Sequence, residues 1–206
     1  MALRPLPRSL RGCSATGMAT AAPHLDRYSR VAVWLHWIIA LLIVLNLLLG
    51  FFREDFERPV RTLMMSIHKA IGLTILVLTL ARIGWRLGHR PPPFDPVMKR
   101  WEIGLARAVH WAFYLLLILL PLSGWAVVSG SGRPTSWFGL FDIGALPVSR
   151  SEDAHEAFEE IHKLLAYGML GLLALHIAGA LKHHLEGHRQ LIGRMTPWAR
   201  SSDPRP

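Results

Sequence analysis

Long uncharged stretches dominate the hydrophobic pattern of this chain. Val31–Phe52 contains 22 residues without Asp, Glu, Lys or Arg, Ala108–Gly132 contains 25, and Leu164–Leu181 contains 18. Each is close to the roughly 20 residues that an α-helix needs to cross the hydrocarbon core of a bilayer. The pattern therefore predicts three transmembrane helices.

A fourth stretch, Leu63–Trp85, is apolar but has a charge-free centre of only 12 residues, Ala70–Ala81, between Lys69 and Arg82. Long basic side chains can extend toward the membrane surfaces while their helix still spans. We therefore expect an all-α integral membrane protein, a bundle of four transmembrane helices.

The basic residues indicate the orientation of the bundle. The N-terminal arm, the connection between the second and third spans, and the C-terminal tail, with their flanking turns, hold 16 of the 23 Lys and Arg residues. Because positive residues accumulate on the cytoplasmic side, both termini are predicted to be cytoplasmic. The net charge of +9 is then explained by topology, with anionic lipid headgroups as partner, and nucleic acid binding is not expected.

The ends of the chain differ in composition from the spans. Residues 1–25 are rich in Ala, Ser, Pro and Arg and contain no acid, which is typical of a disordered arm or of sequence upstream of a true start at Met18; a transit peptide is a less favoured reading. Residues 26–198 are expected to form one membrane domain and 199–206 a tail. The connection Ser129–Glu152 is expected to lie over the outer face, with its aromatic residues at the membrane interface.

Four histidines lie inside the apolar segments, and their depths match in pairs. With cytoplasmic termini, His36 and His176 share an inner depth, and His68 and His162 share an outer depth. An ionisable side chain at membrane depth is costly and marks a functional site by default. His162 and His176 are 14 residues apart, which places them about 21 Å apart and within about 40° of one helix face. Single histidines can also hydrogen-bond across helices, but the joint pattern favours one ligand site at each level.

Paired histidines at this spacing suit haem. Neutral imidazole is a good axial ligand for haem iron, and two imidazoles fill both axial positions, which favours single-electron transfer over oxygen binding. Opposed pairs about 21 Å apart cannot form one tetrahedral zinc site. Cys13 is the only cysteine, so a CxxCH attachment is absent and any haem is held noncovalently. Small residues near the ligands would admit a flat macrocycle, although ordinary helix packing explains them equally well; they are Gly72, Gly168, Gly171 and Gly179.

Four segments resemble the bacterial cytochrome b561 family over about residues 27–198. They are YSRVAVWLHW, SIHKAIGLTILVLTLARIGWRL, WAFYLLLILLPLSGW and EIHKLLAYGMLGLLALHIAGALKHH. The resemblance implies a multi-pass protein of the bacterial inner membrane with two b-type haems. The ligands that it implies are His36, His68, His162 and His176. Some members of the family resemble superoxide oxidase, which takes an electron from superoxide at the outer face and gives it to ubiquinone.

On the outer side, Lys69 and Lys163 directly follow the two outer ligands, and arginines occupy the neighbouring loops. Fixed cations in a narrow cleft would concentrate an anionic substrate such as superoxide, so the two lysines are the candidates for a catalytic role. Pairing with haem propionates, with nearby acids or with lipid is an equally good interpretation for each.

On the inner side, His110, His183 and His184 are candidates for a quinone site, because reduction of a quinone needs hydrogen-bond donors and a source of protons. Arg82 and Arg107, together with Lys182, could surround the inner haem and the quinone head, and the two arginines are candidates for cofactor binding. The competing interpretation makes all three partners of the haem propionates and anchors at the cytoplasmic surface.

The sequence thus predicts electron transfer through two haems, most simply as a superoxide:quinone oxidoreductase. The alternative is a noncatalytic electron-carrier subunit that serves a separate dehydrogenase or hydrogenase, and a haem-dependent sensor or assembly component is a third reading. Expected partners are membrane lipid, ubiquinone, and superoxide or a redox protein as donor. A homodimer is a further possibility that the sequence does not decide.

Overall fold

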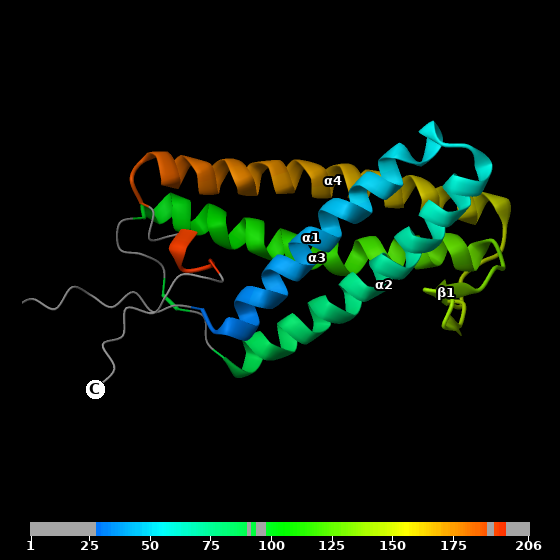
Figure 1. Cartoon of the computed structure of the whole chain (residues 1–206), viewed down its shortest axis with the longest axis horizontal. Coiled ribbons are helices and arrows are strands. Elements are labelled where there is room, and N and C mark those ends of the chain that lie inside the picture. The colour runs from blue at the N-terminus through cyan, green and yellow to red at the C-terminus, as the bar shows by residue number, and fades with distance from the viewer. Residues whose placement is uncertain (1–27, 90–91, 94–97, 189–191, 197–206) are drawn as a thin grey trace, which may run out of the picture.

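Four long helices account for most of the structure. The computed structural model describes residues 28–89, 92–93, 98–188 and 192–196. Along the chain these form α1 (Arg30–Phe51), the 3-10 helix η1 (Phe52–Asp55), α2 (Arg58–Gly88), α3 (Arg100–Gly130), strands β1 (Thr135–Trp137) and β2 (Phe141–Ile143), and α4 (Glu152–Leu185) (Figure 1). All four α-helices are long and apolar enough to cross a membrane, which includes the second one with its short charge-free centre. The predicted fold class is confirmed.

Polar residues set where the helices begin. Ser29 caps α1, its hydroxyl accepting from the Ala32 backbone N–H at 3.3 Å. Ser151 caps α4 in the same way at Ala154, at 3.2 Å, and Glu152 and Asp153 follow in the first turn. Such caps satisfy backbone donors that have no partner inside the helix, and acids there interact favourably with the helix dipole. As a result α4 starts ten residues before His162 and extends well beyond its apolar stretch.

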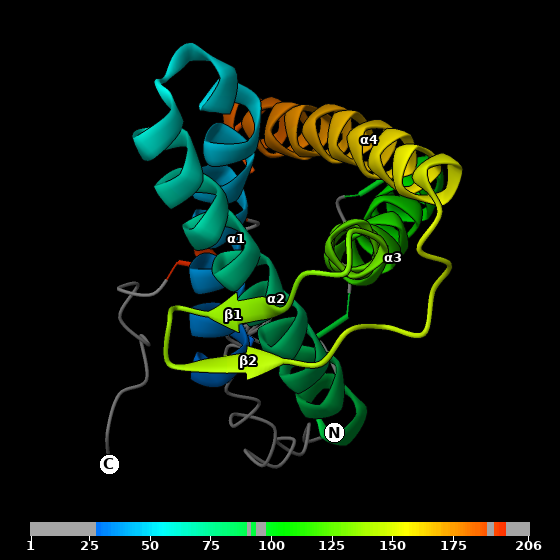
Figure 2. The ribbon, with the colours of Figure 1, turned by 90° about the vertical axis from the view of Figure 1, so that its right-hand side faces the viewer.

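The helices pack in chain order, which leaves the last one facing the first two. The closely packed helix pairs are α1 with α2, α2 with α3, and α3 with α4. Viewed along the bundle, α4 stands opposite α1 and α2 and is joined to them through α3 (Figure 2). Below, the terminal end is the end where α1 begins and α4 ends, and the hairpin end is the opposite one, which carries β1 and β2 (Figure 1).

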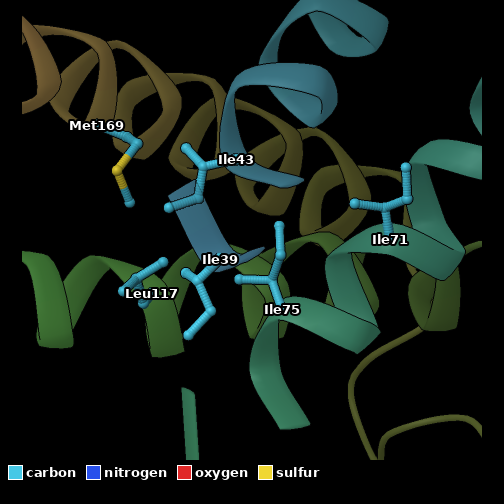
Figure 3. Close-up of a cluster of buried hydrophobic side chains, with 6 residues drawn as sticks. All are labelled: Ile39, Ile43, Ile71, Ile75, Leu117 and Met169. Atoms are coloured by element: carbon cyan, nitrogen blue, oxygen red, sulfur yellow. The ribbon is translucent and has the colours of Figure 1, made fainter. Parts of the chain in front are cut away.

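A buried apolar cluster fills the middle of the bundle. It joins side chains from all four helices, namely Ile39, Ile43, Ile71, Ile75, Leu117 and Met169 (Figure 3). Met169 is 1% exposed and lies seven residues from both His162 and His176, on the same face of α4. The cluster therefore separates the two histidine levels. Large apolar side chains such as Leu41, Val77 and Trp111 are instead exposed on the outside, as expected for contact with lipid.

Two connections return to the bundle. The segment between α3 and α4 forms a β1–β2 hairpin packed against α2, rather than only irregular chain over the helix ends, and Trp137 Nε1 donates to Thr74 Oγ1 at 3.1 Å. Beyond α4, the Met195 carbonyl accepts from Trp37 Nε1 at 2.7 Å, so the C-terminal segment contacts α1 beside His36. The predicted arm at 1–25 and tail at 199–206 lie outside the described residues.

Because Met169 is the fully buried member that α4 contributes to the cluster, Met169→Ala is expected to lower the free energy of unfolding by about 2–4 kcal/mol through the cavity that it leaves. The measurement is unfolding of the detergent-solubilised protein, followed by helix content. Leu164→Ala, on the same helix but 72% exposed, is the matched control and should cost less than about 1 kcal/mol. Equal losses for the two variants would contradict the position of the cluster.

Candidate functional site

The four membrane histidines meet in the predicted pairs. The ring centroids of His36 in α1 and His176 in α4 are 6.3 Å apart, and those of His68 in α2 and His162 in α4 are 6.1 Å apart. The first pair lies toward the terminal end and the second toward the hairpin end. One face of α4 thus presents a histidine to α1 and a second one to α2.

This spacing fits a metal ion shared by each pair. Bonds of about 2 Å from one ion to a nitrogen of each of two opposed imidazoles place the ring centroids about 6 Å apart. Each pair supplies two nitrogen ligands, which is the number that the axial positions of a haem require. The donor set and its spacing therefore fit the cofactor that the sequence predicts.

At the hairpin end, backbone carbonyls orient both imidazoles. His68 Nδ1 lies 3.0 Å from the Asn46 carbonyl oxygen, and His162 Nδ1 lies 3.1 Å from that of Leu120. Because a carbonyl can only accept, each Nδ1 carries the hydrogen and each Nε2 keeps a lone pair for a metal. Such a bond to the far nitrogen is the usual support of a metal-bound histidine. Ser123 Oγ donates to the same Leu120 carbonyl at 2.8 Å and lies 3.0 Å from His162 Nδ1, so it shares the single Nδ1 hydrogen with that carbonyl.

Two glycines make room for these rings. A Cβ atom on Gly50 of α1 would lie 3.1 Å from His68 Cε1, and one on Gly124 of α3 would lie 3.0 Å from His162 Cε1. Neither glycine was predicted to matter, since the sequence does not show how the helices face one another. Of the glycines that were predicted, Gly72 lies near the Asn46 side chain, while a Cβ on Gly168, Gly171 or Gly179 would meet no described atom within 4 Å.

The terminal-end pair has a third histidine beside it. The ring centroid of His110 in α3 lies 5.9 Å from that of His176, as near as His36, and Phe113 packs edge-on against His176 at 5.3 Å. Distance alone therefore does not separate His36 from His110 as the partner of His176.

Arg82 belongs to this level too, since its Nη1 donates to the Ala32 carbonyl at 2.6 Å, one helical turn before His36. Arg107 is exposed on α3.

The other predicted quinone residues do not gather with His110. His183 lines a separate cavity of about 270 Å³ at the terminal end, together with Glu102, Lys182 and Glu186, and His184 is exposed. Lys182 Nζ lies 2.7 Å from Glu102 Oε1 and 3.2 Å from Glu186 Oε2. Acids therefore balance the charge of Lys182.

The two hairpin-end lysines have different surroundings. Lys163 Nζ lies 2.9 Å from Glu160 Oε1 and 3.2 Å from Glu159 Oε1, so its charge is balanced by two carboxylates. Lys69 is half-buried next to His68 and makes no ion pair with any residue that the structure describes. Of these two lysines, Lys69 is therefore the one whose positive charge no described carboxylate balances.

Comparison with known proteins agrees with the predicted resemblance. The family model described as prokaryotic cytochrome b561 matches residues 27–198, which include all four helices. A probable superoxide oxidase CybB from Yersinia pestis is 31% identical over 171 residues, covering 83% of this chain and 96% of that protein. Cytochrome b561 homolog 2 from Escherichia coli K12 is 29% identical over 178 residues, covering 82% and 91%. Cytochrome b561 homolog 1 from the same strain is 27% identical over 175 residues, covering 84% and 98%.

Proposed function

Because this chain belongs to the prokaryotic cytochrome b561 family of membrane electron-transfer proteins that bind b-type haem, we propose that it holds two haems and oxidises superoxide with ubiquinone as acceptor. The observation that carries the proposal is the pair of facing histidines at each of two membrane levels. The relative from Yersinia pestis, named as a probable superoxide oxidase, supports the choice of donor.

His36 with His176 would hold one haem, and His68 with His162 the other. When bound, the haems would supply one-electron transfer. The chain fixes the ligands: α4 contributes one histidine to each site, and carbonyls of α1 and α3 orient the hairpin-end rings. The apolar cluster around Met169 keeps water and ions out of the layer between the sites.

In the predicted orientation the termini are cytoplasmic and the hairpin end faces outward. Superoxide would be oxidised there, and Lys69 is the cation best placed to attract it, because Lys163 is already paired with Glu159 and Glu160. Arg82 remains the candidate partner of a haem propionate at the inner level, where it reaches α1 beside His36. Arg107 is the second candidate.

Ubiquinone takes up two electrons and two protons to become the quinol, and two superoxide anions each lose one electron and leave as oxygen. Protons must therefore reach the quinone from side chains or water. We assign this role first to His110, which lies among the terminal-end histidines. His183, with its cavity and neighbouring Glu102, and exposed His184 are candidates for relaying protons from the cytoplasmic surface.

A second candidate function, an electron-carrier subunit, is favoured by the start of α4. Five carboxylates lie within its first nine residues, Glu152, Asp153, Glu156, Glu159 and Glu160. An acidic face of this kind suits a basic redox protein better than a small anion. The two functions share the same haem sites and differ in the donor.

Removal of single histidines should identify the partner of His176. His36→Ala is expected to lose the terminal-end haem and leave about one haem per chain, because one axial bond is lost, whereas His110→Ala should keep both haems. The measurement is haem content of the purified variants with their reduced spectra. His68→Ala is the control and should lose the other haem, with a different residual spectrum. Loss of haem in His110→Ala, with retention in His36→Ala, would reverse the assignment.

Gly124→Ala is expected to displace the His162 ring, because its Cβ would lie 3.0 Å from His162 Cε1. Haem occupancy at the hairpin end should fall, or the spectrum and potential of that haem should shift, with the helix content unchanged. Redox titration of the purified variant checks this. Gly104→Ala on the same helix, where a Cβ meets nothing within 4 Å, should behave as wild type. A normal titration of Gly124→Ala would contradict the close packing of α3 against the His162 ring.

Superoxide added to the oxidised, purified protein by rapid mixing should reduce the haems, and ubiquinone should reoxidise them. Lys69→Gln is expected to slow reduction by about 3–10-fold and to weaken its dependence on salt, because the variant removes an uncompensated cation. Lys163→Gln, the matched control, should change the rate by less than about 2-fold because its charge is already balanced.

Haems that superoxide leaves oxidised would exclude the oxidase and favour the electron-carrier subunit, provided that a chemical reductant still reduces both of them. Equal effects of the two lysine substitutions would leave the oxidase intact but contradict the role given to Lys69.

A further inference from the structure

The β1–β2 hairpin has one apolar and one polar face. Its antiparallel register pairs Trp137 with Phe141 and Thr135 with Ile143, and between them Ser136 with Asp142. Since side chains alternate along a strand, the first two pairs share one face and the Ser136–Asp142 pair lies on the other. The rings of Trp137 and Phe141 are in contact, with centroids 5.2 Å apart.

The apolar face is attached to a part of α2 that lies in the membrane. Trp137 Nε1 donates to Thr74 Oγ1, and Thr74 belongs to the charge-free stretch Ala70–Ala81. It lies six residues beyond His68, or about 9 Å further along the helix toward the bilayer centre. An indole spans only a short distance from its own backbone, so the hairpin lies at or just inside the membrane boundary.

The turn of the hairpin is apolar and uncovered. Phe138, Leu140 and Phe141 are 48%, 72% and 55% exposed. The turn projects past α2 on the side away from α3 (Figure 2). Phe138 has φ 50°, a left-handed backbone conformation that is unfavourable for a bulky residue and persists only where its surroundings compensate. Within the described residues the ring of Phe138 contacts that of Trp137, at a centroid distance of 5.2 Å. About half of the Phe138 residue stays exposed.

We propose that the β1–β2 hairpin is an interfacial membrane anchor. Its exposed side chains at the turn, Phe138, Leu140 and Phe141, insert into the acyl chains of the leaflet at the hairpin end, while Trp137 holds the hairpin on α2 and Ser136 and Asp142 face the headgroups and water. Amphipathic elements with aromatic residues favour this position in the plane of the interface. The occupant is lipid because the surface continues into the lipid-facing side of α2, where Val77, one turn from Thr74, is 64% exposed.

The anchor can be tested with two labelled positions that lie two residues apart. In the full-length Cys13→Ser protein, reconstituted in phosphatidylcholine vesicles, Leu140→Cys and Asp142→Cys carry an environment-sensitive bimane. Leu140 is exposed and on the turn, so its replacement should leave the fold intact, and Asp142 is exposed on the polar face. The bimane at 140 is expected to emit at shorter wavelength and to be quenched severalfold more by doxyl-labelled lipid than the one at 142. Aqueous iodide should show the reverse order.

Equal iodide quenching at both positions would overturn the anchor and place the turn in water. Shielding of position 140 that appears only at high protein-to-lipid ratio would also overturn it, because the cover would then be a second copy of the chain. Quenching by doxyl lipid that does not depend on this ratio is the result expected for lipid. Neither readout depends on haem or on the electron donor, so the proposed function can fail while this inference stands.

Discussion

The distance between facing imidazoles constrains the whole bundle. In the proposed ligation the two rings of each pair share one metal ion and must keep their centroids about 6 Å apart, so α4 has to satisfy this condition twice, toward α1 at His176 and toward α2 at His162. Close backbone packing of α4 against α1 or α2 would bring the rings too near. The chain meets the condition by packing α4 along α3, so that α3 sets its separation from the other two helices. Met169 and the isoleucines then fill the space between the two levels.

The two levels differ in how firmly the chain holds its histidines. At the hairpin end, Nδ1 of each ring is bonded to a backbone carbonyl, and Gly50 and Gly124 allow α1 and α3 to approach the rings closely. At the terminal end, three histidines and Arg82 gather instead. Fixed geometry suits a site that only passes electrons, whereas additional protonatable groups suit a site where a quinone takes up protons. The asymmetry thus supports quinone reduction at the terminal end.

The sequence was sufficient for features that depend on one helix at a time. Charge-free length predicted three of the four spans, the apolar stretch Leu63–Trp85 between basic side chains predicted the other, and the 14-residue spacing in α4 predicted a histidine at each level. Features that depend on the relative rotation of helices were beyond it. Gly50 and Gly124 matter only because they face His68 and His162, and His110 is close to His176 only through the packing of α3 on α4. The hairpin was missed because its three-residue strands are too short to form a recognisable alternating pattern.

At the hairpin end, the positions of individual charged side chains bear on the choice between the two candidate donors more than their total charge does. Glu159 and Glu160 are paired with Lys163, and Arg53 lies between Glu54 and Glu159. Glu152 and Asp153 lie in the first turn of α4, where the helix dipole partly offsets their charge. These local pairings weaken the long-range field of the acidic face, in which Glu156 stays exposed, and salt screens what remains beyond about 8 Å. Lys69 is half-buried and has no ion-pair partner among the described residues. Because it directly follows His68 in the sequence, its charge lies within this screening length of that proposed ligand. A substrate small enough to reach this lysine experiences a local attraction that a docked protein would not, and this favours superoxide as the donor.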